Sequence, residues 1–342
     1  MTTDERVRRR SLAHRVLIRP ETGAIIASVI AFLIFAVLGG GRGFLTMAGA
    51  STWLEIAAQV GILGVSVTLL MIAGEFDLSI GSMIGAAGMV VALGLTEFAL
   101  PPLIAIALAF VIAIGVGFFN GWLVTRTGLP SFIVTLGMLF LIRGVTIGIT
   151  RLVTGRTQVG GLRELIEGDP FVWLFAGDIQ ILGAGFSMSI VWWVGLTILA
   201  AYVLFRTTFG NWITGTGGNA TAARNVGVPV RRVKIVLFMC TAGSAALLAT
   251  IQVLSVRSAD VSRGDGKELE AIITAVIGGT LLTGGYGSPI GAFFGALTLG
   301  ITKQGIFFAG LGGEWYLAVL GVALLAAVLL SNFIRKRATG VR

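Results

Sequence analysis

Long apolar runs, separated by short polar stretches, make up most of the chain. They span residues 23–38, 57–74, 80–96, 101–123, 130–150, 188–205, 234–254, 269–283, 289–309 and 315–333. Each run is near or somewhat below the ~20 residues that a helix needs to cross hydrocarbon. The pattern therefore predicts an all-α, polytopic membrane protein of about ten transmembrane helices, with one or two of the shorter runs re-entrant.

Composition supports a membrane protein. Of 342 residues, 56% are hydrophobic, 12% are charged and 50 are glycine. An ordinary soluble domain has roughly a quarter of its residues charged, and abundant glycine lets helices approach closely in lipid. The single cysteine, Cys240, excludes an internal disulfide, and the single histidine, His14, leaves no cluster for a transition metal. We expect no metal site.

The distribution of Arg and Lys predicts the orientation of the chain. If the N-terminus is cytoplasmic, the basic segments gather on that side: 1–22, Arg126, 206–234 and 334–342. The mixed-charge stretches 151–187 and 255–268 then lie on the opposite side. This bias favours both termini inside and a single membrane domain over 1–342. The net charge of +9 then follows topology and does not indicate a nucleic-acid partner.

The stretch Gly74–Ala86, GEFDLSIGSMIGA, places Glu75 and Asp77 between two apolar runs. Carboxylates exposed to lipid are costly, so they are expected at a membrane surface, in a protein-lined cavity or at a break between helices. Asp77 and Ser79 are good N-cap residues for the next helix. Two interpretations stay open, a surface turn with a capping Asp and a helix break that lines a solute path.

Two glycine-rich hexamers hint at an internal two-fold repeat. GSMIGA at 81–86 recurs as GSPIGA at 287–292, and each opens a predicted helix. Many transporters consist of two such related halves. The expected helix order puts both hexamers at cytoplasmic helix ends, whereas an inverted repeat requires opposite ends. Either the helix count or the inverted repeat must therefore be wrong.

Three further polar features interrupt the apolar pattern. The loop Gly217–Lys234 has the composition of a short cytoplasmic helix that stops at Gly227, and it is either a docking element or a topology signal. Arg143, inside an apolar run, is expected to pair with a carboxylate or to cap carbonyls. Lys303, near the outer end of its run, either extends to the headgroups or lines a path.

Three blocks carry a family resemblance. GEFDLSIGS resembles the GGIDLSVGS signature of permease subunits in ribose-type ATP-binding-cassette (ABC) importers, the branched-chain amino acid/ribose permease superfamily. Asn120–Gly144 resembles their NGxLxxxxxxPxFIVTLGxxxxxRG block, and Ile277–Leu297 resembles their IGGTSLxGGxGSxxGxxxGAL block. The resemblance covers roughly 57–310. The chain departs from the pattern at Glu75-Phe76, where Gly-Ile is usual, and at Thr221, where Glu is usual.

The resemblance implies a transport subunit of a bacterial inner membrane, without enzymatic activity or a cofactor of its own. A solute-binding protein, periplasmic or lipid-anchored, would deliver a simple sugar such as a pentose, a hexose or a related polyol. A cytoplasmic ATPase would hold ATP and Mg²⁺, in agreement with the lack of a G-x4-G-K-[ST] loop in this chain. A second permease, identical or paralogous, would complete the path. The alternative is an ion-gradient-driven transporter or channel that uses Asp77 and Glu75.

The resemblance also assigns roles to residues of this chain. The loop that fits into the ATPase, the coupling helix, would use Gly218, Asn219, Thr221, Ala222, Ala223 and Gly227. The translocation path or helix break would use Asp77, Ser79, Gly81, Ser82, Asn120, Ser131, Thr135, Arg143, Gly287 and Ser288.

Overall fold

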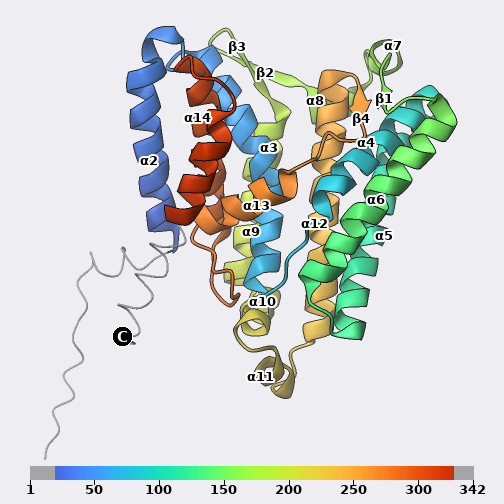
Figure 1. Ribbon diagram of the computed structural model, residues 1–342, viewed down its shortest axis with the longest axis vertical. Helices are drawn as coiled ribbons and strands as arrows, with labels where there is room; N and C mark the ends of the chain where they lie inside the picture. The colour runs from blue at the N-terminus through green and yellow to red at the C-terminus, as the bar shows by residue number, and fades with distance from the viewer. Residues whose placement is uncertain (1–19, 327–342) are drawn as a thin grey trace, which may run out of the picture.

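The computed structural model describes residues 20–326, which form a helical bundle with two small β-ladders (Figure 1). The long helices and their partners are α2 (Pro20–Gly39), α3 (Met47–Ile72), α4 (Ile80–Thr96), α5 (Pro102–Thr127), α6 (Ser131–Thr154), α9 (Met188–Arg206), α10 (Thr208–Gly218), α11 (Ala220–Asn225), α12 (Val230–Val256), α13 (Lys267–Ile277) and α14 (Pro289–Phe308). A further helix spans Trp315–Ala326. The connections hold η1 (Gly40–Arg42), α7 (Arg163–Ile166), α8 (Pro170–Ala176), β1 (Gln158–Val159), β2 (Asp178–Ile181), β3 (Ala184–Ser187) and β4 (Ala259–Asp260).

The polytopic α-helical architecture is as predicted, but the expected spans are of unequal length. Within residues 20–326, seven helices are long and apolar enough to cross a membrane: α2, α3, α5, α6, α9, α12 and α14. The run 57–74 belongs to α3, which begins earlier, at Met47. The run 80–96 is the 17-residue helix α4, and the run 269–283 holds only the 11-residue helix α13 before a glycine-rich loop. Most of the expected cytoplasmic segments 1–22 and 334–342 lies outside the described residues.

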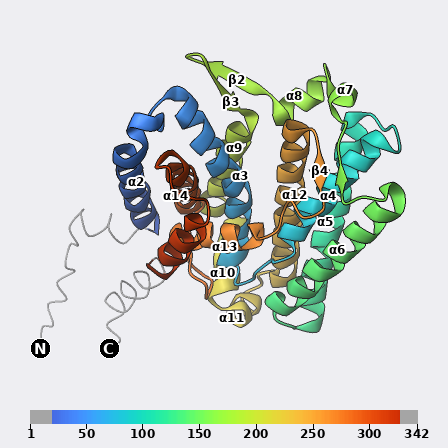
Figure 2. The same cartoon turned by 45° about the horizontal axis from the view of Figure 1, so that its top comes forward.

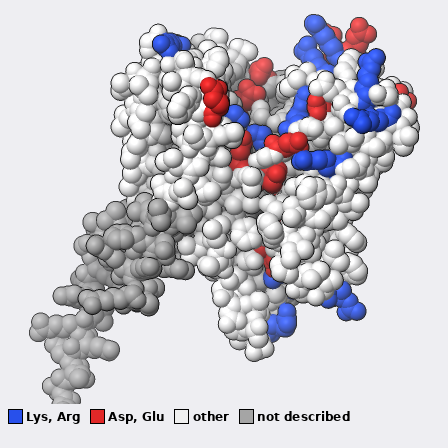
Figure 3. All heavy atoms as spheres, viewed as in Figure 1, with Lys and Arg blue, Asp and Glu red and all other residues white. Residues whose placement is uncertain are grey.

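The bundle has two distinct ends. Helix α11 projects from one end, and the β2–β3 hairpin covers the other (Figures 1 and 2). At the hairpin end, β1 pairs antiparallel with β4, so the two mixed-charge stretches 151–187 and 255–268 are joined. The hairpin itself pairs Asp178 with Ser187 and Ile181 with Ala184. Charged side chains gather at both ends and in a hollow between the two sides of the bundle (Figure 3).

The helices form two antiparallel pairs. In one pair, α5 packs against α12, and Gly121 and Gly117 lie close to Ile235 and Phe238. In the other, α3 packs against α14, where a Cβ on Gly300 would overlap Ala57. Small residues at these crossings let the backbones approach, as lipid-embedded helices require.

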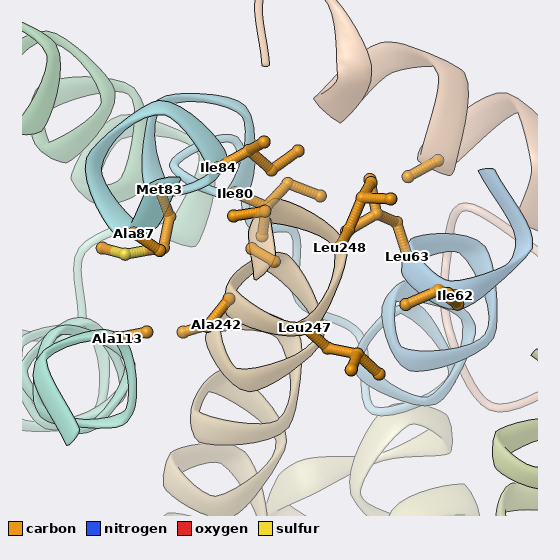
Figure 4. Packing of buried hydrophobic residues seen from close by; sticks show 14 of the residues in the cluster. Ile62, Leu63, Ile80, Met83, Ile84, Ala87, Ala113, Ala242, Leu247 and Leu248 are labelled. Carbon is orange, nitrogen blue, oxygen red and sulfur yellow. The ribbon is translucent and has the colours of Figure 1, made fainter. Parts of the chain in front are cut away.

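Packing between α3, α4, α5 and α12 forms the main hydrophobic core (Figure 4). Ile80 and Met83 of α4 are buried in it, together with Leu248 of α12 and Leu63 of α3. Because α4 is buried on almost every side, its sequence is apolar all round instead of amphipathic. The core therefore encloses the start of α4, where the acidic turn lies.

Two series of helices, α3–α6 and α12–α14, run in opposite senses. In Figure 1, α3 and α5 run down and α4 and α6 run up, whereas α12 and α14 run up. Each series contains a helix break with the same sequence pattern, DLSIG at Asp77–Gly81 and DVSRG at Asp260–Gly264. In both, the Asp Oδ1 accepts a hydrogen bond from the backbone N–H two residues on, at 3.0 Å in the first and 2.7 Å in the second.

This arrangement corrects the expected repeat. GSMIGA (81–86) lies inside the bundle at the start of α4, whereas GSPIGA (287–292) lies at the α11 end, at the start of α14. The two hexamers are not equivalent. Gly81 shares its place in the sequence pattern with Gly264, and the two breaks touch at this point, because a Cβ on Gly81 would lie 2.8 Å from the Gly264 carbonyl oxygen. The two hexamers therefore open helices in different surroundings, and their expected equivalence is not seen.

The contact between the two breaks can be tested by adding one methyl group. Gly81→Ala should lower the free energy of unfolding by about 1–3 kcal/mol, because its Cβ would overlap Glu268 and approach Gly264. Gly137→Ala on α6 is the matched control, since a Cβ there meets nothing within 4 Å. Thermal unfolding in detergent measures both. Equal midpoints for Gly81→Ala, Gly137→Ala and the wild type would contradict the close contact.

Candidate functional site

Helix α3 ends in a Schellman motif, which produces the break before α4. Gly74 has a φ of +82°, a left-handed conformation that glycine adopts without a steric penalty. Its N–H bonds to the Met71 carbonyl at 2.9 Å, and the Glu75 N–H bonds to the Leu70 carbonyl at 3.1 Å. This double hydrogen bond satisfies carbonyls that the helix end leaves free. The chain then turns back into the bundle through residues 75–79.

Asp77 anchors the turn from inside the protein. Its side chain is 0% exposed. Oδ1 accepts hydrogen bonds from the Ser79 N–H at 3.0 Å and the Ser79 hydroxyl at 2.6 Å, and Oδ2 accepts one from the Thr241 hydroxyl at 2.6 Å. Asn120 Nδ2 donates to Ser79 Oγ at 2.9 Å. The turn is thereby bound to α5 and to the middle of α12.

These contacts overturn the expected N-cap. Ser79 is the residue before α4, but its side chain makes no capping hydrogen bond, and Asp77 bonds to Ser79 and Thr241 instead of the helix N–H groups. The surface-turn interpretation is also wrong, because Asp77 is fully buried. For the same reason Asp77 does not line an open path in this structure. Its role in the geometry is to hold the break against α12.

Other predicted residues gather around the same turn. The Phe76 N–H donates to Ser131 Oγ at 3.0 Å, at the start of α6. Thr135, one turn further along, is fully buried and donates to the Ser131 carbonyl at 2.8 Å. The break is therefore attached to α5, α6 and α12 through Asn120, Ser131 and Thr241.

Glu75 forms an ion pair with Lys234, in the first turns of α12. Both side chains are mostly buried, at 10% and 18% exposed. Lys234 was expected as part of the basic cytoplasmic loop, but its ammonium group points to the end of α3. The pair also neutralises one of the two carboxylates that an ion-gradient mechanism would need. Arg143, which was expected to pair with a carboxylate or to cap carbonyls, does not pair with Glu75 or Asp77.

Arg143 instead pairs with Asp265, at 2.6 Å between Nη2 and Oδ1. Asp265 belongs to the second break, between β4 and α13. Glu268 of α13 is buried beside it, and the Oε2 atom has no hydrogen-bond partner among the described residues. Gly81 and Ser82, in the first turn of α4, lie on this side, since a Cβ on Gly81 would overlap Glu268.

Lys303 also finds partners inside the bundle. Its ammonium group lies 3.6 Å from Glu270 Oε1 and 5.0 Å from the centre of the Tyr316 ring. Glu270 also pairs with Lys267 at 2.6 Å. Of the two expected roles, extension to the headgroups is not seen, because Lys303 joins α13, α14 and the helix Trp315–Ala326.

Gly287 and Ser288 lie apart from Asp77, near the α11 end. Ser288 precedes α14 as its N-cap, with its hydroxyl 3.3 Å from the Gly291 N–H, and it donates to Glu21 Oε1 at 2.8 Å. Gly287 lies against Ile72. The predicted site is thus distributed over three places, namely the Asp77 turn, the second break with Arg143, and the base of α14.

The loop 206–234 contains the short helix that its composition predicts. Asn219 caps α11 by accepting the Ala222 N–H at 2.9 Å. The helix ends in a second Schellman motif, with Gly227 at a φ of +89°. Thr221 and Ala222 are exposed, whereas Ala223 packs inward, and Gly218 ends the preceding helix α10. An exposed capped helix of this kind presents a firm surface at the α11 end.

Sequence reasoning missed three residues that complete the site: Thr241, Asp265 and Glu268. A signal for the last two was present in the sequence, because the D-[LV]-S-x-G pattern of Asp77–Gly81 recurs at Asp260–Gly264, directly before them. Nothing in the local sequence marks Thr241. It lies in an apolar helix, and only the fold brings its hydroxyl to Asp77.

Comparison with known proteins identifies the family. Residues 49–328 match the family described as branched-chain amino acid transport system, permease component. The chain belongs to this permease family. It is 33% identical to the ribose import permease protein RbsC of Escherichia coli (strain K12) over 91% of this chain and 94% of the relative. No solved structure was found to match.

Two further relatives carry other sugar names. The fructose import permease protein FrcC of Rhizobium meliloti is 29% identical over 95% of this chain and 89% of its own length. The xylose transport system permease protein XylH of Escherichia coli (strain K12) is 30% identical over 92% of both chains. The family resemblance inferred from the three sequence blocks is confirmed. The chain is a multi-pass permease component of the inner membrane and a transport subunit, not an enzyme.

The stabilising role of Asp77 in the turn between α3 and α4 can be tested by substitution. Asp77→Ala removes the acceptor for Ser79 and Thr241, which leaves buried hydroxyl and N–H groups unpaired and should cost about 1–3 kcal/mol in the free energy of unfolding. Asp77→Asn keeps one acceptor oxygen and should cost less. Thermal unfolding in detergent ranks the variants. Unchanged stability of Asp77→Ala would show that the buried network does not hold the break.

Proposed function

We propose that the chain is the permease subunit of an ABC importer for a simple sugar, a pentose, hexose or related polyol. Membership in the permease family and relatives named for ribose, fructose and xylose import support this substrate class. The observation that carries the proposal is the capped, exposed helix α11 at the end opposite the β-hairpin, below the end of α3 in Figure 1. An importer driven by a separate ATPase requires an exposed surface of this kind, on which the ATPase can dock.

The two ends of the bundle fit different partners. We assign the α11 end to the cytoplasm, because Arg126, Arg206, Arg224, Arg231 and Arg232 lie on the segments at that end, as the positive-inside rule requires. The residues Gly218–Gly227 would contact the ATPase. The hairpin end would receive the solute-binding protein, whose docking ion pairs with the charged loops 151–187 and 255–268 would set its orientation. A second permease copy or a paralogue completes the transporter.

In this proposal the buried residues around Asp77 hold a helix break instead of binding sugar. Ser79, Asn120 and Ser131 support the same turn, and Arg143 supports the second break. Because the solute-binding protein selects the sugar, the permease needs only a weak sugar-binding site. The permease residues then act by moving the two inverted series relative to each other, as alternating access requires.

The energy source separates an ABC importer from an ion-driven transporter. The permease, with its candidate ATPase and solute-binding protein, is reconstituted in liposomes without an ion gradient. We expect sugar uptake that depends on ATP and disappears when the ATPase is omitted. Uptake that ignores ATP and follows a proton or sodium gradient would overturn the proposal.

The role of α11 can be tested at the glycine that ends it. Gly227→Val forces a β-branched residue to a φ of +89°, which should cost about 1–2 kcal/mol locally and displace the end of α11. Gly128→Val is a matched control, because Gly128 has a φ of +73°, lies in open space and joins α5 to α6 at the same end. ATP-driven uptake should fall in Gly227→Val and persist in Gly128→Val.

Normalisation to folded protein in the membrane separates this effect from lost expression. Equal uptake and equal stimulation of the ATPase in Gly227→Val and Gly128→Val would contradict the assignment of α11 as the ATPase contact.

A further inference from the structure

We infer that two contacts at the end of α3, a cluster of glycines and the Glu75–Lys234 ion pair, transmit movement of α11 to the Asp77 turn. The glycine junction consists of Gly74, Gly217, Gly218, Gly284 and Gly285. The inference rests on the proposed function, since it assigns the positioning residues that connect the proposed ATPase contact with the helix break.

The glycine junction joins three segments that are far apart in the sequence. Gly74 ends α3, Gly217 and Gly218 end α10, and Gly284 and Gly285 lie in the loop between α13 and α14. A Cβ on Gly284 would lie 2.8 Å from the Gly74 Cα, and a Cβ on Gly285 would lie 2.9 Å from the Gly218 Cα. A Cβ on Gly217 would overlap the Ile72 carbonyl oxygen. The three backbones therefore touch directly.

Direct backbone contact makes the junction stiff. The Gly285 N–H donates to the Ile72 carbonyl at 2.8 Å and so satisfies one of the last carbonyls of α3. With no side chains between them, the end of α10 cannot shift without displacing the end of α3 or the α13–α14 loop. These two segments belong to the two different inverted series, so one movement reaches both.

The glycine junction holds one end of the segment that carries α11, and the ion pair holds the other end. The segment that carries α11 leaves the bundle at Gly218 and returns at Val230. Lys234, just after the return, holds Glu75, just after the glycine junction. Both ends of the α11 segment are thus attached to residues 72–75. Movement of α11 is passed on to Phe76 and Asp77, which are bound to Ser131 and Thr241.

Single neutralisations and a charge reversal test the ion pair. Glu75→Gln, Lys234→Gln and the reversed pair Glu75→Lys with Lys234→Glu are reconstituted with the ATPase and the binding protein. The readout is sugar transported per ATP hydrolysed. Each single variant should lower this ratio about tenfold, and the reversed pair should recover most of it. Lys234→Arg, which keeps the charge, should stay near wild type.

Two controls separate coupling from folding and from general charge. Arg126→Gln removes a positive charge at the same end, where Arg126 is exposed and has no ion pair with another described residue. It should leave the ratio unchanged. Gly217→Ala should lower the ratio, whereas Gly215→Ala, two residues away with only an ordinary contact at 3.9 Å, should not.

The outcomes distinguish the inference from the function on which it rests. Absence of ATP-driven uptake in the wild type would overturn both. ATP-driven uptake in the wild type, together with normal ratios in Lys234→Gln and Gly217→Ala, would overturn the inference alone. A reversed pair no better than the single variants, in folded protein, would also overturn the role of the ion pair.

Discussion

Hydrocarbon offers no hydrogen-bond partners, so every helix that stops inside the bundle must have its free backbone groups satisfied by the protein. The end of α3 meets this requirement through the Schellman motif at Gly74 and the Gly285 N–H. The turn that follows meets it through Asp77, whose carboxylate accepts the Ser79 N–H. The location of the acidic residues, the glycines and the polar side chains of α5, α6 and α12 follows from this one requirement.

Two similar turns, one in each helix series, satisfy the requirement and lie against each other. Asp77 and Asp260 form the same local turn, and the breaks that they organise touch where Gly81 meets Gly264. The glutamates next to the two breaks differ in their partners. Glu75 pairs with Lys234, whereas Glu268 keeps an oxygen without a partner among the described residues. The two series are therefore alike in their local turns and unlike in charge.

Much of this fold could be predicted from the sequence, because apolar runs and glycine punctuation are local signals. The runs placed the helices, and Gly227 marked the end of α11. Local signals could not give burial. Asp77 has the sequence of an N-cap, and only the packing of α12 turns it into a buried anchor for Thr241. Arg143 and Lys303 stood out as charges inside apolar runs, but their partners are distant in the sequence and depend on tertiary structure.

The two helix series pack with α3 antiparallel to α12, which places the two breaks side by side. Ser66 of α3 and Ser244 of α12 have hydroxyl oxygens 2.6 Å apart at this contact. In a Cys240→Ser background, Ser66→Cys with Ser244→Cys should form an intramolecular disulfide in native membranes under mild oxidation. Ser66→Cys with a cysteine at exposed Val256, at the far end of α12, should not. Crosslinking of the second pair and not the first would contradict the account.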